Sequence, residues 1–587
     1  MLREDAMEAF TPAVQQTQDK WKSLTESHPE IFRASSTQVL LAWFGMVFSH
    51  TNQFGDFAVF DGHTPEVVTS EDFAATELTT MADAEYEKSQ SCQRFDAFVS
   101  HPWAAGRMAK HMALLFHMNI RLAVGSSVFT WVAGNIGFLA TVGFDVTALG
   151  GEPMLGPVLI FLPTIVFLLV FWFGQQLTCH VFKLSVWVDK LCIHQTREDL
   201  KSLGVQNLDV FVAAADRMIL LWNESFFSRL WCNLEVATFC ALNGGADRID
   251  FCPLWLAPWV LNTIMLDIVS SVIFVIMLPT SQKISDSLGP DLGLFVRVVV
   301  NLVVTYLPAI VPNCISFRAK IRATTMMMQQ IENYRLEEAK CAVESDRAVV
   351  ETQVSTFFSN AELQFKQRRS ISEKDNSAVP EDRAALVQPD SERAGGRSNR
   401  QDGVDNFNAF MRTDFRRHME ARVGSATRLP YWISLVVFLP LIFSSSVDAL
   451  GCENRDCTEA AALMGVESPH LFVSVVALNC IQLIHYCMQE VRDGPLQFIN
   501  CCAAVVLGYF HMGVVEGAVV TLNSMILKDS AWWAPVAWLG VMAYLSALNY
   551  HLFLAKDPLP LRPSQHAAPV PLADGAKAKG VALALLA

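Results

Sequence analysis

Charged residues are scarce in this chain of 587 residues: Asp, Glu, Lys and Arg make up 17% of it, and hydrophobic residues make up 52%. Soluble globular proteins carry about 25% charged residues, and the mean hydropathy here is +0.30. The shortage of charge excludes an ordinary soluble protein and indicates a membrane protein. The formal net charge of −14 leaves no basic excess for a nucleic-acid interface, so we expect no nucleic-acid partner.

Two further features are missing from the sequence. Residues 1–20 contain no apolar core, so we expect no cleavable signal peptide and assign targeting to the first membrane span. No standard zinc spacing occurs either. The candidate set that comes nearest to one is Cys192, His194, Cys232 and Cys240, and we predict no metal site.

Long apolar runs are abundant. A run of about 18 or more mostly apolar residues can cross a hydrocarbon core of about 30 Å, and the sequence predicts eight such spans. They are Leu122–Phe144, Leu155–Phe173, Leu254–Leu278, Leu294–Ile315, Leu429–Val447, Leu471–Tyr486, Phe498–Leu522 and Trp532–Leu554.

The basic residues near the span ends predict how the chain is oriented. One set of loops holds nearly all of them, whereas the opposite set holds only Lys283, Arg455 and Lys528. Because Lys and Arg accumulate on the cytosolic side, both termini are predicted to be cytosolic, and the lipid bilayer is an expected partner. Only Cys452 and Cys457 then lie in an outward loop where a disulfide is favoured.

Strands and helices alternate around the first two spans. Phe95–Ser100 is a short apolar run before the first span, and Ser185–Asp189 and Met218–Trp222 are similar runs after the second. Arg248–Leu254 is either a further strand or a linker. Alternating strands and helices indicate a parallel sheet. Since two spans return the chain to the side that it left, we predict one cytosolic α/β domain with a transmembrane hairpin inserted in its first crossover.

The remaining segments divide by composition. An apolar patch at Val39–Phe48, too short to span a bilayer, is either a packing helix or a membrane-surface helix. The predicted organisation is: 1–90, N-terminal cytosolic region; 91–121 and 177–253, split α/β domain; 122–175, inserted hairpin; 254–316, spans three and four; 317–368, cytosolic helical arm; 369–404, disordered linker; 405–428, cytosolic helix; 429–555, spans five to eight; 556–587, flexible tail.

Polar and aromatic residues gather where the predicted strands end. Ligands bind outside the carboxyl ends of parallel strands, so these residues form a candidate binding site. In the helix expected after Met218–Trp222, Glu235 follows Trp231 by four residues, so the two side chains share one helix face. A carboxylate beside aromatic rings suits a sugar hydroxyl or a developing positive charge, although Glu235 can also serve as a local helix residue. The candidate set is Ser100, His101, Trp103, Asp189, Lys190, Trp222, Trp231 and Glu235.

Taken together, these segments resemble a known family. FDAFVSH, VWVD, MILLW and the run Ser228-x-x-Trp231-Cys232-x-x-Glu235 are similar to motifs of the Toll/interleukin-receptor (TIR) domain. The resemblance covers Arg94–Asn119 and Leu184–Leu254. It stops before a fifth strand and final helix, because a span follows the fourth candidate strand directly.

The resemblance implies a flavodoxin-like parallel sheet that associates with itself or with other TIR domains. In a subset of the family it also implies cleavage of NAD at the nicotinamide glycosidic bond, with the carboxylate that matches Glu235 as the catalytic residue. Lys190–Gly204 would then shape both the nucleotide pocket and the partner surface, and Trp103 or Trp222 would stack on a ring of NAD. No bound cofactor is implied; NAD is the possible substrate.

Three functions therefore stay open at the level of sequence. The first is a membrane-anchored signalling or scaffold protein that acts through the TIR-like module. The second is an NAD glycohydrolase that uses Glu235, and the third is a channel or transporter that the module gates. Polar residues within the spans bear on the third function, since they either line a path or join helices. They are Asp267, Arg297, Asn479, Gln482, His485, His511 and Glu516.

Overall fold

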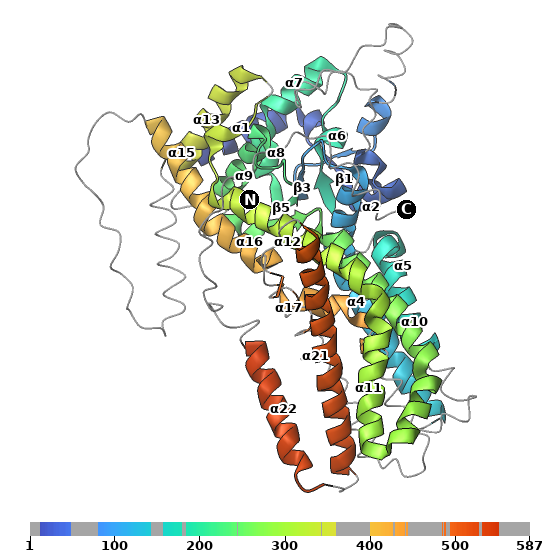
Figure 1. Cartoon of the computed structure of the whole chain (residues 1–587). Coiled ribbons are helices and arrows are strands. Elements are labelled where there is room, and N and C mark those ends of the chain that lie inside the picture. Colours follow the sequence, from blue (N-terminus) through green and yellow to red (C-terminus); the bar gives the residue numbers. More distant parts are fainter. Residues whose placement is uncertain are drawn as a thin grey trace, which may run out of the picture.

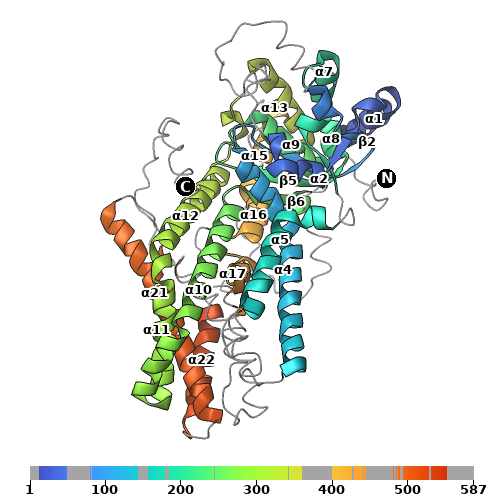
Figure 2. The same cartoon turned by 90° about the vertical axis from the view of Figure 1, so that its right-hand side faces the viewer.

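The structure is a computed structural model, and a mixed six-stranded sheet is at the centre of its α/β module. The module lies at one end of a bundle of long helices (Figures 1 and 2). The structure describes residues 12–48, 80, 82–142, 157–178, 184–243, 245–341, 343–359, 399–425, 429–440, 442–443, 480, 484, 487–488, 494–527 and 531–550.

Four parallel strands form the main part of the sheet. The strand order is β2-β1-β4-β3-β5-β6. β3 pairs in parallel with both β4 and β5, and β5 pairs in parallel with β6. The segments before and after the hairpin thus share one sheet, as the sequence predicts. The strands are β1 (Arg33–Ser36), β2 (Gln90–Ser91), β3 (Phe95–Ser100), β4 (Ser185–Trp187), β5 (Ala215–Trp222) and β6 (Ile249–Pro253).

Two strands at one edge correct the expectation of a purely parallel sheet. β1 runs antiparallel to β4, with Ser35 opposite Val186, and antiparallel to β2. β1 is only four residues, RASS, so it has no apolar alternation to predict a strand. Backbone pairing on both sides holds β1 between β2 and β4, and the Arg33 side chain adds hydrogen bonds to Ser89. The described part of the predicted N-terminal region 1–90 therefore contributes a strand to the sheet.

The apolar patch at Val39–Phe48 is not one helix. It forms α2 (Thr37–Leu41) and two single turns, η3 (Ala42–Phe44) and η4 (Met46–Phe48). Leu40, Leu41, Val47 and Phe48 are buried in the core, so part of the patch packs as the sequence allows.

Aromatic rings fill the core beside β4. Trp187 stacks on Phe98 with ring centroids 4.6 Å apart and on Phe211 at 5.5 Å, and Phe32 packs edge-on against Phe211. Complete burial of each large apolar side chain contributes about 1.5–3 kcal/mol. The covering helices are α6 (Asp189–Cys192), α7 (Glu198–Gln206), α8 (Leu208–Ala213) and α9 (Leu230–Leu242).

A polar contact closes the sheet where the hairpin leaves and re-enters it. The Asp96 carboxylate accepts hydrogen bonds from the Ser185 backbone N–H at 2.7 Å and from its hydroxyl at 2.8 Å. Ser185 Oγ in turn accepts from Asp96 N at 3.0 Å. These bonds fix β3 against β4 although the hairpin separates them in the sequence.

Within the described residues, five helices are long and apolar enough to cross a membrane. They include α4 (Arg107–Val142), α5 (Leu162–Leu177, with the preceding π turn), α10 (Leu256–Leu288), α11 (Pro290–Tyr306) continued by α12 (Ile310–Glu332), and α21 (Pro495–Leu527). They match predicted spans one to four and seven. α22 (Ala534–Asn549) is a shorter apolar helix, and most of Leu471–Tyr486 lies outside the described residues. The total of eight spans stays a prediction.

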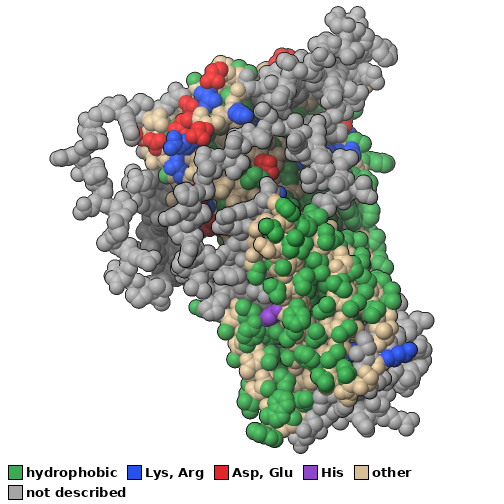
Figure 3. Space-filling model, viewed as in Figure 1, with side chains coloured by type: hydrophobic (Ala, Val, Ile, Leu, Met, Phe, Trp, Pro, Cys, Tyr) green, Lys and Arg blue, Asp and Glu red, His purple; other side chains and the backbone are tan. Residues whose placement is uncertain are grey.

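The first span is part of a longer helix than its apolar run. α4 has 36 residues, which at about 1.5 Å per residue exceeds the roughly 30 Å of a hydrocarbon core. Its first turns belong to the module, where Lys110 and His111 are buried. Figure 3 shows that hydrophobic side chains cover the described surface of the helical bundle, whereas charged side chains gather on the module.

The arm after the fourth span folds back onto the module. It continues from α12 through the turn Leu336–Glu338 to α13 (Glu344–Phe358) and later α15 (Asn399–Phe410) and α16 (Arg416–Val423). α15 begins within the predicted disordered linker, because Val404, Phe407 and Phe410 are buried. The rest of that linker, the loop with Cys452 and Cys457, and the tail 556–587 lie outside the described residues.

One buried carboxylate joins the module to the arm and to the first span. Asp250 on β6 is 5% exposed and forms a two-point ion pair with Arg217 on β5 at 2.7 and 2.6 Å. Arg422 on α16 lies 3.4 Å from it, and His117 on α4 lies 3.6 Å away. Burial raises the pKa of Asp250, but Arg217 and His117 outweigh that effect, so the net pKa is lowered.

Candidate functional site

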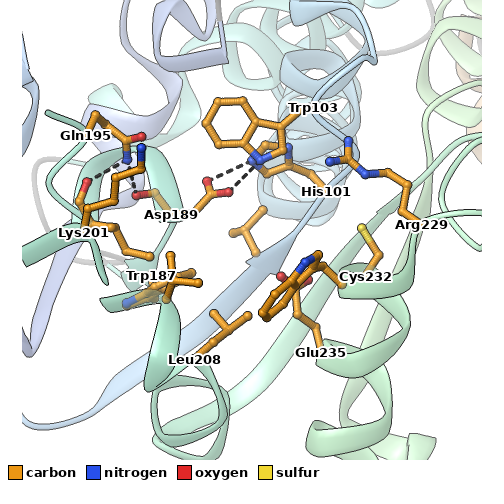
Figure 4. A pocket seen from close by; sticks show the side chains of 14 residues that line it. His101, Trp103, Trp187, Asp189, Gln195, Lys201, Leu208, Arg229, Cys232 and Glu235 are labelled. Carbon is orange, nitrogen blue, oxygen red and sulfur yellow. Dashed lines mark hydrogen bonds and ion pairs between the residues drawn. The ribbon is translucent and has the colours of Figure 1, made fainter. Parts of the chain in front are cut away.

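A cavity of about 80 Å³ opens at the carboxyl ends of β3 and β4. One wall comes from the segment after β4 and the other from the start of α9 (Figure 4). Its lining is mostly apolar and aromatic, with a few charged side chains, which is the usual make-up of a ligand site. The lining residues are Val99, His101, Trp103, Trp187, Asp189, Ile193, Gln195, Lys201, Val205, Leu208, Arg229, Trp231, Cys232 and Glu235.

Asp189 is the hydrogen-bonded centre of one side of the cavity. Trp103 Nε1 donates to Asp189 Oδ2 at 2.9 Å, and His101 Nε2 lies 3.3 Å from Asp189 Oδ1 (Figure 4). The backbone N–H of Lys190 donates to Oδ1 at 2.7 Å. Burial raises the pKa of Asp189, but His101 and this N–H more than offset it, so the net pKa is lowered and Asp189 is ionised at neutral pH.

Glu235 faces the cavity from the opposite side. Its carboxylate accepts a hydrogen bond from Ser100 Oγ, which brings the end of β3 against α9. Glu235 borders the cavity and is otherwise enclosed by protein. Burial raises its pKa most, the negative charge of Asp189 adds to the rise, and Ser100 and Arg229 oppose it; the net result is a pKa of about 8. The site therefore holds two carboxyl groups in opposite protonation states at neutral pH.

Arg229 brings a cation to the same side as Glu235. It is the extended residue that precedes α9, and its side chain lines the cavity next to Cys232 (Figure 4). The backbone at Arg229 bridges to Lys340 of the arm. An anionic group that entered the cavity would meet this guanidinium.

Gln195 fixes the wall that follows β4. Its side-chain amide donates to the backbone oxygens of Asp189 at 3.0 Å and Ile193 at 2.7 Å. Two residues further along this wall, the backbone N–H of Arg197 donates to His194 Nδ1. His194 Nε2 lies 2.7 Å from Asp83 Oδ1. These contacts hold the loop between α6 and α7 in a defined shape.

Five of the predicted site residues line the cavity, namely His101, Trp103, Asp189, Trp231 and Glu235. Ser100 lies behind them and contacts Glu235. The two other predictions require correction. Trp222 is 1% exposed and packs against Phe251, because β5 is buried on both faces at its end. Lys190 is turned into the protein, where burial lowers its pKa against the opposing effects of Glu85 and Asp189.

The sequence did not indicate Arg229, Gln195 or Lys201 as site residues. Arg229 is the residue directly after Ser228 in the motif that ends at Glu235, so its position gave a usable signal. Gln195 and Lys201 lie within Lys190–Gly204, the segment that the resemblance assigned as a whole to the pocket, but no pattern in the sequence singles out these two residues.

No metal site is found among the described residues, since no three His, Cys, Asp or Glu side chains there are placed to hold an ion. Cys192 and Cys240 are buried thiols, and burial raises the pKa of Cys192 to about 12. His194, the histidine considered with them, faces Asp83.

The polar residues within the spans make helix-to-helix contacts. Tyr306 donates its hydroxyl hydrogen to Asp267 at 2.6 Å, its ring stacks on Tyr509 at 4.3 Å, and Asn313 donates to the Tyr509 oxygen at 2.7 Å. These contacts join α10, α11, α12 and α21. His511 lies 2.8 Å from the Tyr544 hydroxyl. Asn479, Gln482 and His485 lie outside the described residues.

Comparisons with known proteins give no relative for this chain: no family model, no curated protein and no solved structure matches it.

Proposed function

We propose that this is a membrane-anchored signalling protein whose TIR-like α/β module cleaves NAD at the nicotinamide glycosidic bond with Glu235. One observation carries the proposal. Glu235, which the TIR motif singles out, borders a cavity at the strand ends together with Trp103, Asp189 and Arg229.

The order of the parallel strands supports this proposal. Numbered along the chain, β3, β4, β5 and β6 lie in the order second, first, third, fourth. Flavodoxin-like sheets begin in the same order and bind their ligands in the crevice where the order reverses. Here that reversal falls at β3, and the cavity lies beyond its carboxyl end. β6 is followed directly by α10, as the sequence predicted.

The proposed reaction breaks the bond between the ribose C1′ and the nicotinamide nitrogen. The electron pair of that bond goes to the pyridinium ring, which leaves as neutral nicotinamide and gives the ribose an oxocarbenium character. The Glu235 carboxylate stabilises this positive charge, and a water molecule then adds to C1′ and releases a proton. The products are nicotinamide and ADP-ribose. Trp103 would stack on a ring of the substrate, and Arg229 would face its phosphates.

The size of the cavity sets one requirement. Ligand sites for molecules of drug size have volumes of about 300–1,000 Å³, whereas this cavity has about 80 Å³. NAD binding therefore requires the wall formed by residues 193–208 to move away from α9. The bonds of Gln195 to Asp189 and Ile193 lie at the base of this wall.

The test measures nicotinamide release from NAD by the full-length protein in lipid nanodiscs. The Glu235→Gln variant keeps the shape of the side chain and cannot carry the negative charge, so its rate should fall by about 100-fold or more. Glu26→Gln, at an exposed position of α1 (Pro12–Ser27) outside the cavity walls, is the matched control and should keep the wild-type rate. Equal rates for wild-type protein and Glu235→Gln would refute the enzymatic proposal.

The small volume of the cavity, about 80 Å³, favours a second candidate, in which the module is a non-catalytic interaction scaffold. Its signalling partner would be another TIR-like domain or a second copy of this chain. In that case wild-type protein releases no nicotinamide above the Glu235→Gln level, and the module binds a TIR-like domain in a pull-down. The same two proteins thus separate the candidates.

A further inference from the structure

Three apolar side chains project from the turn between α2 and the rest of the module. Trp43 is 81% exposed, Phe44 is 54% exposed and Met46 is 50% exposed. Single exposed apolar residues are common on protein surfaces, but three within four residues form a local apolar patch. This patch is named here the Trp43 turn.

The backbone of the Trp43 turn is held in an unfavourable conformation. Trp43, Phe44 and Gly45 have φ values of 51°, 55° and 66°, all in the left-handed region. That region costs a residue with a side chain roughly 1–2 kcal/mol. Burial of Val47 and Phe48, each 4% exposed, fixes the residues that follow. The fold thus keeps two aromatic side chains outward at a cost in backbone energy.

The Trp43 turn lies against the end of the membrane hairpin. The Phe44 ring is 5.9 Å from the His111 ring on α4 and 6.4 Å from the Trp172 ring on α5. Arg107 Nη1 lies 3.3 Å from Met46 Sδ. The preceding helix α2 is also bound to α5, because Thr37 donates to the Gln175 side chain at 2.9 Å. The turn is therefore placed where α4 and α5 leave the module.

We propose that the Trp43 turn inserts into the headgroup layer of the bilayer leaflet that faces the module. Tryptophan and other aromatic side chains favour this layer, where an apolar ring and a polar edge are both satisfied. The exposed apolar surface continues onto α5, where Phe173 is 47% exposed and Leu177 is 58% exposed. Arg107 beside the turn supplies a cation for a lipid phosphate. Lipid contact replaces the water that the three side chains would otherwise meet.

The insertion also links the bilayer to the cavity described above. Phe48, two residues after Met46, packs edge-on against His101 with ring centroids 5.2 Å apart, and Lys110 Nζ lies 5.6 Å from the Phe48 ring centre. His101 in turn faces Asp189. The turn thus fixes the height and tilt of the cavity relative to the membrane. This inference does not depend on NAD cleavage.

The test uses the photoreactive residue p-benzoylphenylalanine in place of Trp43 in the full-length protein, reconstituted in vesicles of phosphatidylcholine and phosphatidylserine. After irradiation, mass spectrometry of the peptide that contains position 43 should show lipid adducts. The matched control carries the same residue at Val349, which is 56% exposed on α13 in the arm, and should show several-fold fewer adducts.

Two outcomes overturn the proposal: equal lipid adducts at positions 43 and 349, or adducts at position 43 that join two protein chains instead of protein and lipid. If the substitution at Trp43 prevents folding, the same residue at Phe44 provides the test, because it differs from phenylalanine only by the added benzoyl group. Each variant is first checked for the wild-type elution volume and melting temperature.

Discussion

At the scale of single residues, two carboxyl groups that line the cavity have different pKa values because their surroundings differ. Asp189 is held ionised by His101 and by the backbone N–H of Lys190, whereas burial raises the pKa of Glu235 to about 8. Groups with divergent pKa values in one site are typical of acid–base and electrostatic catalysis. The proposed chemistry needs the Glu235 carboxylate, and that group is mainly protonated at pH 7.

A pH dependence follows from that protonation state. A raised pKa means that Glu235 loses its proton only as the pH approaches about 8. The kcat/KM for nicotinamide release should therefore rise from pH 6 to pH 8 and level off above it. Steady-state rates across this range check the expectation. Glu235→Gln should remove the rise, and a wild-type rate that falls over the same interval would contradict the role given to the carboxylate.

The same proton also affects folding, with the opposite sign. Because the pKa of Glu235 is higher in the folded protein than in the unfolded chain, its contribution to stability is complete below about pH 4.5 and is lost as the pH rises through about 8. Ionisation of Glu235 therefore lowers the stability of the folded protein at the pH where the proposed reaction is fastest.

At the scale of elements, the membrane helices are joined by buried polar contacts. Asp267 on α10 is 3% exposed and accepts from Tyr306 on α11. A polar group left without its partner in an apolar interior costs about 1–3 kcal/mol, so this bond bears on the packing of α10 against α11. The stacked Tyr509 extends the contact to α21.

Tyr306→Phe should lower the stability of the helical bundle by about 1–3 kcal/mol, because it removes the hydrogen-bond donor to a buried carboxyl group and little volume. Thermal unfolding in detergent measures the change. Tyr544→Phe removes the same atom, with its 2.8 Å contact to His511, from a half-exposed ring and should lower stability by less, about 0.5–1 kcal/mol. Equal losses of stability in the two variants would show that the hydrogen bond to Asp267 contributes no more than the Tyr544 hydroxyl does.

How much of this arrangement the sequence predicts depends on the type of element. Apolar runs predicted β3, β4 and β5, and the long helices, because burial on both faces or in lipid leaves a continuous pattern. Arg33–Ser36 was not predicted as a strand, since its four residues show no apolar alternation and pairing with both β2 and β4 holds it in the sheet. At the site, strand ends predicted His101 and Asp189, but Trp222 ends its strand facing the core.

At the scale of the whole molecule, one continuous stretch of chain joins the membrane helices to the cavity. α12 reaches the module, where Gln330 Nε2 donates to the Glu224 oxygen at 2.8 Å. The chain then pairs with the start of α9: Lys340 N donates to the Ser228 oxygen at 2.6 Å, and Leu230 N donates to the Lys340 oxygen at 3.0 Å. Displacement of α12 would therefore act on the helix that carries Glu235.

Lys340→Pro tests this connection. Proline has no N–H, so the bond to Ser228 is lost, and the amide of Leu230 should exchange its hydrogen faster as the start of α9 loosens. Hydrogen exchange of the full-length protein in nanodiscs measures the rate. Lys340→Ala removes the same charge and keeps the N–H, and it should exchange at the wild-type rate. Identical exchange in both variants would mean that the arm does not support α9.

The position of β3 constrains how the protein is made. Its two neighbours, β4 and β5, are both synthesised after the hairpin of α4 and α5, and β1 also pairs with β4. While the ribosome is still producing the first two helices, β3 has no strand to join. Insertion of the hairpin into the lipid must therefore precede completion of the sheet. A chain stalled before Ser185 would present β3 without a partner, and β1 paired only with β2, to the chaperones that follow translation.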